Sequence, residues 1–252
     1  MKELQNRVVW VTGSTRGIGA AVARAFAARG AKVAVHGRDA DAAAGVCAQL
    51  RQAGARAISV LGDLTQFAQV QSLHEQVEQE LGPIDILVAN AGGSHSPPGP
   101  LEETTEAGWH DSIEGNLTAT FLTLKSVLPG MKRRRAGNII TISSAAGRRP
   151  HPRSPIPYAV AKAGICLLTQ DVAAQVGEFG IRVNCIAPET ILTERNQERI
   201  PEAQKPMLVD AHPLKRLGTP EDVAEAALFL ASDAAAWITG VVLDVAGGAV
   251  MV

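Results

Sequence analysis

The chain has 252 residues, enough for one α/β domain with a well-buried core and slightly too few for two full domains. Its 24 Lys and Arg residues nearly balance 25 Asp and Glu residues, and the formal net charge is -1. A chain of this charge lacks the general positive field that attracts nucleic acid or anionic membranes. We therefore expect a single domain over residues 1–252 that binds neither nucleic acid nor a membrane.

The cysteines and the amino-terminal segment indicate the cellular compartment of the protein. Cys47, Cys166 and Cys185 are odd in number, far apart and embedded in apolar segments, which is typical of reduced, buried thiols and not of disulfides or a metal site. The first residues contain too short an apolar run for a signal peptide, and no later run approaches a membrane span. We predict a cytoplasmic protein without a bound metal.

Short runs rich in Val and Ile alternate with longer Ala-rich stretches of helical period, a pattern typical of repeated βαβ units. Gly30 and Gly54 stand where helices should end, and Thr219 followed by Pro220 predicts a capped helix start. The predicted strands cover residues 7–12, 32–36, 57–61, 84–89, 138–142, 182–187 and 241–245. The predicted helices cover residues 17–29, 40–53, 67–81, 111–131, 158–177 and 220–230.

This alternation predicts an α/β fold with a single Rossmann-type domain, in which a doubly wound parallel seven-stranded sheet carries helices on both faces. Such sheets bind ligands at the carboxyl ends of their strands. Three long connections follow strands and should rim one cleft there as substrate loops, near residues 93–101, 145–157 and 189–217.

A glycine-rich turn with the sequence T-G-S-T-R-G-I-G follows the first predicted strand at residues 12–19. Glycine lets backbone N–H groups approach a pyrophosphate, and the start of the next helix adds partial positive charge. A sharp strand-to-helix turn needs glycine for steric reasons alone, but this turn opens the first βαβ unit, where a dinucleotide binds. The candidate phosphate-binding residues are Gly13, Ser14, Thr15, Arg16, Gly17, Ile18 and Gly19.

The end of the second predicted strand indicates which cofactor binds. It reads V-H-G-R-D and lacks, directly at its tip, the acidic residue that would bind a free ribose 2′-hydroxyl. Arg38 and Arg16 would instead pair with a 2′-phosphate, which favours NADP(H) over NAD(H). The alternatives are that both arginines are ordinary surface charges and that Asp39 accepts the ribose hydroxyl.

Tyr158 and Lys162 lie four residues apart at the start of a predicted helix, so their side chains share one face. A neighbouring ammonium and a positive nicotinamide would lower the tyrosine pKa and make Tyr158 an acid/base. Ser144, with Ser143 in reserve, follows the preceding strand and is the candidate for binding a substrate oxygen. Both hydroxyls would otherwise bind turn backbone.

Together these residues resemble the short-chain dehydrogenase/reductase family, in the group that includes 3-oxoacyl-acyl-carrier-protein reductases, over nearly the whole chain. The glycine turn is followed in the family's order by Asp63-Leu64, by N-A-G at Asn90, Ala91 and Gly92, and by Y-x-x-x-K at Tyr158 and Lys162. The resemblance implies a tetrad of catalytic residues: Asn116, Ser144, Tyr158 and Lys162.

The resemblance also implies a role for each residue. Tyr158 would be the acid/base, Ser144 would hold the substrate oxygen, Lys162 would bind the nicotinamide ribose, and Asn116 would support a proton relay through water. Asp63 and Leu64 would bracket the adenine, and residues 90–92 would support the sheet and the adenosine ribose. The residues that would secure the nicotinamide carboxamide are Pro188, Ile191 and Thr193.

Plainer structural roles exist for several of these residues. Asp63 would serve equally as a helix cap, Asn90 as a turn residue and Asn116 as a buried kink in a helix.

Two positions depart from the family pattern. Glu189 stands where relatives usually have glycine, and its carboxylate would either oppose an anionic substrate or point to solvent. The loop before Tyr158 is one residue longer than usual and holds Arg148, Arg149 and Arg153. These arginines would attract an acidic or carrier-bound substrate, or they are simply solvated.

The leading hypothesis is an NADP(H)-dependent oxidoreductase that moves a hydride between nicotinamide and a carbonyl or secondary alcohol, of ketoreductase type, with a 3-oxoacyl thioester as one possible substrate. The alternatives are an NAD-dependent alcohol dehydrogenase of the same fold and a non-catalytic nucleotide-sensing regulator. The substrate is a small molecule, and the resemblance implies a homotetramer or homodimer.

Overall fold

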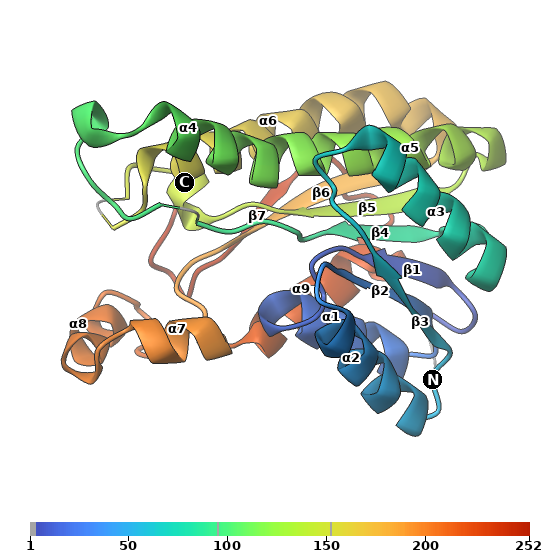
Figure 1. Ribbon diagram of the computed structural model, residues 1–252, viewed down its shortest axis with the longest axis horizontal. Coiled ribbons are helices and arrows are strands. Elements are labelled where there is room, and N and C mark those ends of the chain that lie inside the picture. The colour runs from blue at the N-terminus through green and yellow to red at the C-terminus, as the bar shows by residue number, and fades with distance from the viewer. Residues whose placement is uncertain (1–3, 95, 152) are drawn as a thin grey trace.

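A seven-stranded parallel sheet runs through the middle of the molecule (Figure 1). The computed structural model describes residues 4–94, 96–151 and 153–252; His95 and Pro152, from two predicted substrate loops, lie outside the described residues, as do residues 1–3. The strand order β3-β2-β1-β4-β5-β6-β7 confirms the doubly wound topology. The strands are β1 Val8–Val11, β2 Lys32–Gly37, β3 Ala57–Leu61, β4 Ile86–Ala89, β5 Gly137–Ile142, β6 Ile181–Pro188 and β7 Val242–Val245.

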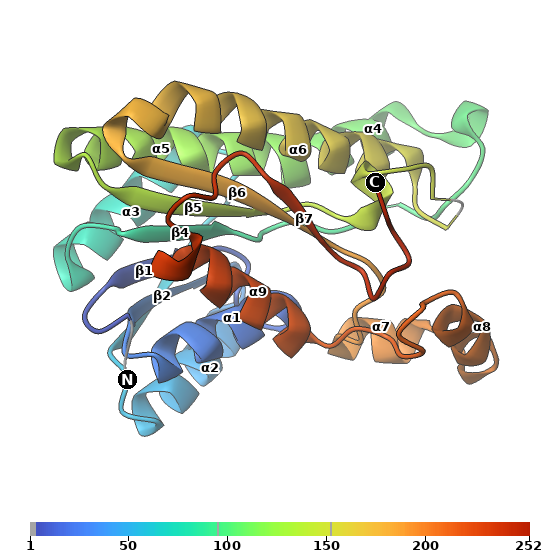
Figure 2. The same ribbon diagram turned by 180° about the vertical axis from the view of Figure 1, so that it is seen from behind.

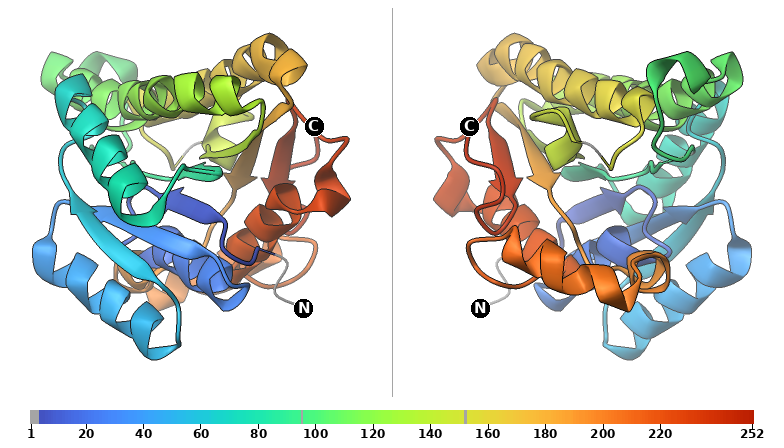
Figure 3. Two further views of the ribbon diagram at one scale, coloured as in Figure 1. Left: turned by 90° about the vertical axis from the view of Figure 1, so that its right-hand side faces the viewer. Right: turned by 90° about the vertical axis from the view of Figure 1, so that its left-hand side faces the viewer.

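Helices cover both faces of the sheet, and Figure 3 shows the resulting three layers end-on. One face carries α1 Gly17–Ala28, α2 Ala40–Gln52 and α9 Pro220–Ala231. The other face carries α3 Phe67–Leu81, α4 Glu106–Ile113, α5 Ala119–Arg134 and α6 Ile156–Val176. Two short helices, α7 Glu194–Arg199 and α8 Lys205–Asp210, project beyond the carboxyl edge of the sheet, as Figure 2 shows from behind.

The central strands are buried on both faces because each face is covered by helices. All four residues of β1 are buried, and Trp10 is fully enclosed. Alternate side chains of β1 point into two separate apolar cores, one beneath α1 and α9 and one beneath α3 and α5. This double burial explains why the strands read as continuous apolar runs.

Several predicted helix ends are confirmed. Gly30 and Gly54 adopt left-handed φ angles of 90° and 82° just after α1 and α2, where only glycine is unstrained. Thr219 and Asp222 form a reciprocal capping box at the start of α9, with Pro220 in the first turn.

Two predictions about helices were wrong. The segment 111–131 is not one helix: α4 begins at Glu106, a π-helical turn spans Glu114–Thr118, and α5 continues to Arg134. The segment 189–217 is not a plain loop, since α7 and α8 lie within it. Both predictions failed for the same reason: a π turn and a six-residue helix leave almost no periodic pattern of apolar residues in the sequence.

Among the described residues, no helix combines the length and the apolar character needed to cross a bilayer.

Candidate active site

The glycine turn between β1 and α1 is confirmed as a close backbone approach. Gly13 and Gly17 have φ angles of 61° and 54°. A Cβ on Gly19 would lie 2.3 Å from the carbonyl oxygen of Gly13, and a Cβ on Gly13 would lie 2.8 Å from the Cα of Ala91. Side chains cannot occupy these positions, so the backbone of the turn can come close to a ligand, and Gly17 N at the start of α1 donates to Glu194 Oε2 at 3.1 Å.

Ser14, a predicted phosphate-binding residue, makes its hydrogen bonds within the protein. Its side chain is fully buried, and its hydroxyl donates to Val11 O at 2.7 Å and accepts from His36 N at 3.0 Å. Its own N–H donates to His36 O at 2.8 Å. With its N–H and hydroxyl both engaged, Ser14 ties β1 to β2.

His36 is a residue of the turn that sequence reasoning missed. Its Nδ1 accepts from Gly13 N at 3.1 Å, so its Nε2 carries the proton and donates to Gly62 O at 3.1 Å. Burial lowers its pKa from 6.5 to about 4. The ring is therefore neutral at physiological pH, and it links the glycine turn to the residue that follows β3.

Two adjoining cavities form a channel across the carboxyl ends of the strands. They measure about 350 Å³ and 240 Å³ and share Gly13, Arg16 and Gly92. The glycine turn and the start of α1 lie where the two cavities meet, which fits an extended dinucleotide with its pyrophosphate at the turn. The predicted cofactor residues that line the channel are Gly13, Thr15, Arg16, Gly17, Ile18, Gly19, Arg38, Asp63, Leu64, Asn90, Ala91, Gly92, Tyr158, Lys162, Pro188, Ile191 and Thr193.

The end of β2 separates the two predicted ribose contacts. Arg38 is exposed and lines the channel beside Arg16. Asp39 instead caps α2, and its Oδ1 accepts from Ala42 N at 3.0 Å. Asp39 therefore caps the helix with one carboxylate oxygen, and both Arg38 and Asp39 line the channel.

Asp63 and Asn90 each line the channel and also stabilise a turn of the protein. Asp63 Oδ1 accepts from both the N–H and the hydroxyl of Thr65 at 2.9 Å, which shapes the turn before α3 without capping the helix. Asn90 Nδ2 donates to Thr12 O at 3.0 Å and to Gly13 O at 2.9 Å. Asn90 thus braces the glycine turn from β4.

The π-helical turn buries Asn116 completely. Its Oδ1 accepts from Gly93 N at 2.9 Å, and its Nδ2 donates to Gly93 O at 3.0 Å and to Ser112 O at 2.8 Å. A Cβ on Gly92 would lie 2.4 Å from Asn116 Oδ1, so glycine is required there. Asn116 therefore fixes the loop after β4 against the helix that lines the site.

Lys162 extends from α6 beneath the channel and is almost fully buried. Its Nζ donates to Ile142 O at 2.9 Å. Burial lowers its pKa from 10.5 to about 8. Ser143 is excluded as the substrate-binding serine, because its buried hydroxyl donates to Lys162 O at 2.7 Å.

Tyr158 lines both the channel and the pocket beside it, one turn above Lys162 on α6. Lys162 Nζ lies 5.7 Å from the centre of the tyrosine ring. The prediction that this ammonium lowers the phenol pKa is not confirmed. Burial raises the Tyr158 pKa overall, against the lowering effects of the Ser144 hydroxyl and the Arg195 guanidinium.

Ser144 completes the junction between the channel and the pocket. It follows β5 in extended conformation, lines both cavities, and accepts from Ala146 N at 3.2 Å. The hydroxyl therefore serves the turn, as the plainer prediction held, and still faces the phenol. Of the two serines, Ser144 is the one beside Tyr158.

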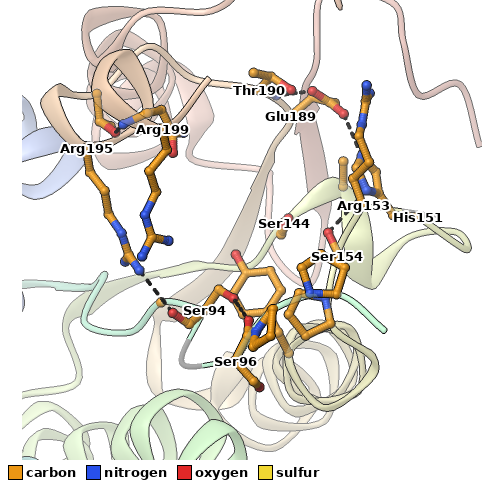
Figure 4. Close-up of a pocket in the computed structure, with 18 residues that line it drawn as sticks. Ser94, Ser96, Ser144, His151, Arg153, Ser154, Glu189, Thr190, Arg195 and Arg199 are labelled. Carbon is orange, nitrogen blue, oxygen red and sulfur yellow. Dashed lines mark hydrogen bonds and ion pairs between the residues drawn. The ribbon is translucent and has the colours of Figure 1, made fainter. Parts of the chain in front are cut away.

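The pocket beside Tyr158 is confirmed as the meeting point of all three predicted substrate loops (Figure 4). Its volume is about 890 Å³, within the range of small-molecule sites. The loop after β4 contributes Ser94 and Ser96, the loop after β5 contributes His151 and Ser154, and the segment after β6 contributes Thr190.

Glu189 neither faces an anionic substrate as a free charge nor points to solvent. Its side chain is only 7% exposed, and Oε1 lies 3.0 Å from His151 Nε2. Oε2 accepts from Thr190 N and lies 3.4 Å from His212 Nε2. Bonds from His151 and Thr190 overcome the cost of burial and lower the Glu189 pKa to about 2. This carboxylate fastens the loop after β5 to the segment after β6.

The remaining arginines of the 145–157 loop divide into two kinds. Arg148 forms a two-bond ion pair with Asp244 on β7, and Arg149 donates to Ala249 O at 2.7 Å. Arg153 lines the pocket. Sequence reasoning missed two further pocket arginines, Arg195 and Arg199, because α7 left no periodic signal.

The comparisons agree with this geometry. A family model described as enoyl-(acyl carrier protein) reductase matches residues 13–250. The chain is 41% identical over 245 residues to cis-4-hydroxycyclohexanecarboxylate dehydrogenase of Sinomonas cyclohexanicum, and the alignment covers 96% of each chain. It is 37% identical over 248 residues to a 3-oxoacyl-acyl-carrier-protein reductase of Escherichia coli strain K12, covering 98% of this chain and 99% of the relative.

A solved structure is similar throughout. The 3-oxoacyl-acyl-carrier-protein reductase of Brucella melitensis with bound NAD matches with a TM-score of 0.93 at 33% identity, covering 100% of this chain and 94% of the other. The chain is thus an oxidoreductase that acts on alcohols or ketones with a nicotinamide cofactor. With its fold, glycine turn and Tyr–Lys pair in the expected order, it belongs to the short-chain dehydrogenase/reductase family.

Proposed function

We propose that this protein is an NADP(H)-dependent reductase of a carbonyl compound, working reversibly on the secondary alcohol, with Tyr158 as the acid/base. One observation carries the proposal: the Tyr158 phenol lies where the dinucleotide channel opens into the substrate pocket. When bound, the cofactor supplies or accepts the hydride. The phenol, which burial keeps protonated at neutral pH, is positioned to donate a proton to the carbonyl oxygen.

The other tetrad residues have supporting roles. The Ser144 hydroxyl steadies the substrate oxygen beside the phenol. The Lys162 ammonium, held by Ile142 O, is placed to bind the nicotinamide ribose. Asn116 holds the loop that carries Gly92 and Gly93, and it would support a proton relay through water.

Replacing Tyr158 tests the assignment most directly. We expect Tyr158→Phe to lower kcat by at least about 100-fold, because general acid catalysis contributes about that much. NADPH binding, measured by fluorescence titration, should stay near the wild-type value. Unchanged turnover would refute the acid/base role, and a wild-type protein that binds NADPH but reduces no ketone or β-keto thioester would favour the non-catalytic sensor.

Arg38 and Arg16 support NADP(H) as the cofactor, since both line the adenosine end of the channel while Asp39 is occupied as a helix cap. Two observations support the NAD alternative: Asp39 lines the same end of the channel, and the similar Brucella melitensis structure has bound NAD. The two cofactors differ by a charged 2′-phosphate.

Dissociation constants separate the two cofactors. We expect NADPH to bind at least about tenfold more tightly than NADH at low salt, with the difference shrinking as salt rises. Arg38→Gln should weaken NADPH binding by about tenfold and leave NADH binding unchanged. Tighter binding of NADH by the wild-type protein would contradict the proposal and favour the NAD-dependent alcohol dehydrogenase.

We further propose that residues 1–252 act as one domain, in the cytoplasm, as a homotetramer or homodimer. The single sheet supports one domain, and the free, buried cysteines suit a reducing compartment. Exposed apolar side chains on α5 and α6 support association, namely Phe121 at 45%, Val160 at 42% and Leu167 at 59% exposure.

A further inference from the structure

Three guanidinium groups line the substrate pocket. Arg153 comes from the loop after β5, while Arg195 and Arg199 come from α7. Figure 4 shows Arg195 and Arg199 reaching in from one side of the pocket and Arg153 lying near His151 on the other. Their positive charge therefore surrounds the space next to Tyr158.

Of the three arginines, Arg195 has the best-defined contacts. It is half-buried, and its Nη2 donates to Ser94 O at 3.1 Å. Burial lowers its pKa, and the like charges of Arg199 and Arg16 lower it further. Its own charge reaches the phenol and lowers the Tyr158 pKa. A guanidinium held here against two others is an unfavourable arrangement that an anion would relieve.

No carboxylate of the described residues forms an ion pair with Arg153, Arg195 or Arg199. The acidic side chains that line the pocket and the adjoining channel, Glu189 and Glu194, are engaged elsewhere. Glu189 is bound by His151 and Thr190, and Glu194 Oε2 accepts from Gly17 N at 3.1 Å in the dinucleotide channel. The pocket thus keeps a net positive charge toward its contents.

The rest of the lining suits a small polar molecule. Hydroxyl and amide groups dominate it, and the apolar contribution comes from short side chains such as Pro97, Pro98 and Ala145. Long acyl chains and steroids gain affinity from extended apolar walls, which these residues do not provide. Charge and lining therefore point to the same class of substrate.

We propose that the substrate is an oxo acid, or the matching hydroxy acid, whose carboxylate binds Arg195 and Arg199 while its carbonyl oxygen meets Tyr158 and Ser144. This inference rests on the proposed function, which it narrows to carboxylate-bearing substrates. The carboxylate is unchanged in the reaction: the carbonyl carbon gains a hydride, the carbonyl oxygen gains a proton, and the acid group anchors the molecule. Arg153 adds charge at the rim and draws the anion in.

Matched acids and esters test the proposal by kinetics. Levulinate and oxocyclohexanecarboxylate are compared with their methyl esters, which keep the ketone and remove the charge. We expect kcat/KM to be about 10- to 100-fold higher for the acids, since hydrogen bonds to a charged group are the strong ones. Added salt should reduce this preference, mainly through the exposed Arg153 and Arg199.

Substitutions assign the preference to residues. Arg199→Gln should lower kcat/KM for the acids by about tenfold and leave the esters within about twofold. Arg195→Gln should also lower kcat/KM for the esters, because its charge acts on the Tyr158 phenol, but the loss for the acids should be about tenfold larger. Arg24→Gln, an exposed arginine on the outer side of α1, is the control and should change neither. Esters reduced as fast as the acids, or variants that lose both substrates equally, would overturn the inference.

A binding measurement keeps this inference separate from the proposed function. Calorimetric titration of the NADPH-loaded protein with cyclohexanecarboxylate and with cyclohexanecarboxamide needs no turnover. We expect only the carboxylate to bind, and Arg195→Gln to weaken it by about tenfold. Carboxylate binding without any ketone reduction would refute the proposed function alone. Equal binding of acid and amide, or tighter binding of phenyl phosphate than of the carboxylate, would refute the carboxylate assignment.

Discussion

Lys162 and Tyr158 stand one turn apart on α6, and burial moves their pKa values in opposite directions. The buried ammonium loses its proton more easily, and the buried phenol keeps its proton to higher pH. The sequence predicted that the two residues meet, because a spacing of four fixes neighbours on a helix. The lowered Tyr158 pKa predicted with a bound nicotinamide is not seen in the protein alone, where burial raises the pKa, because desolvation depends on everything packed around the group.

His36 gives a residue-scale prediction for stability against pH. Its pKa is lowered in the fold, so between pH 6.5 and about 4 the unfolded chain binds a proton that the folded chain does not. Stability should be intact above pH 6.5 and fall by about 3 kcal/mol as the pH drops to 4. Urea unfolding across this range measures the effect.

The non-titrating variant His36→Gln should be less stable at pH 7 and show a flatter pH dependence. His110→Gln, at an exposed site on α4, should retain the wild-type slope. An identical slope in His36→Gln and the wild-type protein would show that other groups cause the acid sensitivity.

At the scale of elements, the strands and long helices were predictable, since continuous Val and Ile runs and capping residues such as Thr219 are local signals. The π turn around Asn116 was not, because Asn116 there bonds to the backbone of Gly93, which belongs to the loop after β4. The pairing of Glu189 with His151 could not be predicted for the same reason. It joins two loops whose relative placement exists only once β5 and β6 lie side by side.

Glu189→Gln should loosen the loop after β5. The amide keeps the shape but loses the charge that His151 and Thr190 bind, so we expect a loss of about 2 kcal/mol in unfolding free energy at pH 7. The Glu189 pKa is lowered from 4.5 to about 2, so this contribution is present above pH 4.5 and disappears as the pH falls to 2. KM should rise more than kcat falls.

Urea unfolding at pH 7 and steady-state kinetics check both expectations. Glu75→Gln, at an exposed position on α3, serves as the matched control and should change neither quantity. A variant with normal stability and normal KM would show that the loop is held by other contacts.

At the scale of the whole molecule, double winding brings the ends of β1, β4, β5 and β6 together, so residues from the first and last thirds of the chain share one site. The βαβ pattern predicted this shared site. It did not predict that the outer faces of α5 and α6 expose apolar residues such as Phe121 and Leu167, because apolar residues are usually expected in the core.

These outer faces predict the assembly. Leu167→Glu combined with Phe121→Glu should shift a tetramer or dimer toward smaller species, because the charges would be buried unpaired in an interface. Sedimentation equilibrium at micromolar concentration measures the masses. Met207→Glu, at a 56% exposed site on α8, should leave the mass unchanged. A monomeric wild-type protein would contradict the prediction.

The hydrogen bond between Glu194 and Gly17 joins positions 177 residues apart and connects α7 to the start of α1. Its first residue touches the amino end of α1, and its last residue, Arg199, reaches the pocket where the substrate would lie. A ligand group that binds Gly17 N takes the place of that carboxylate, so the first turn of α7 loses its tie to the glycine turn whenever such a ligand is present.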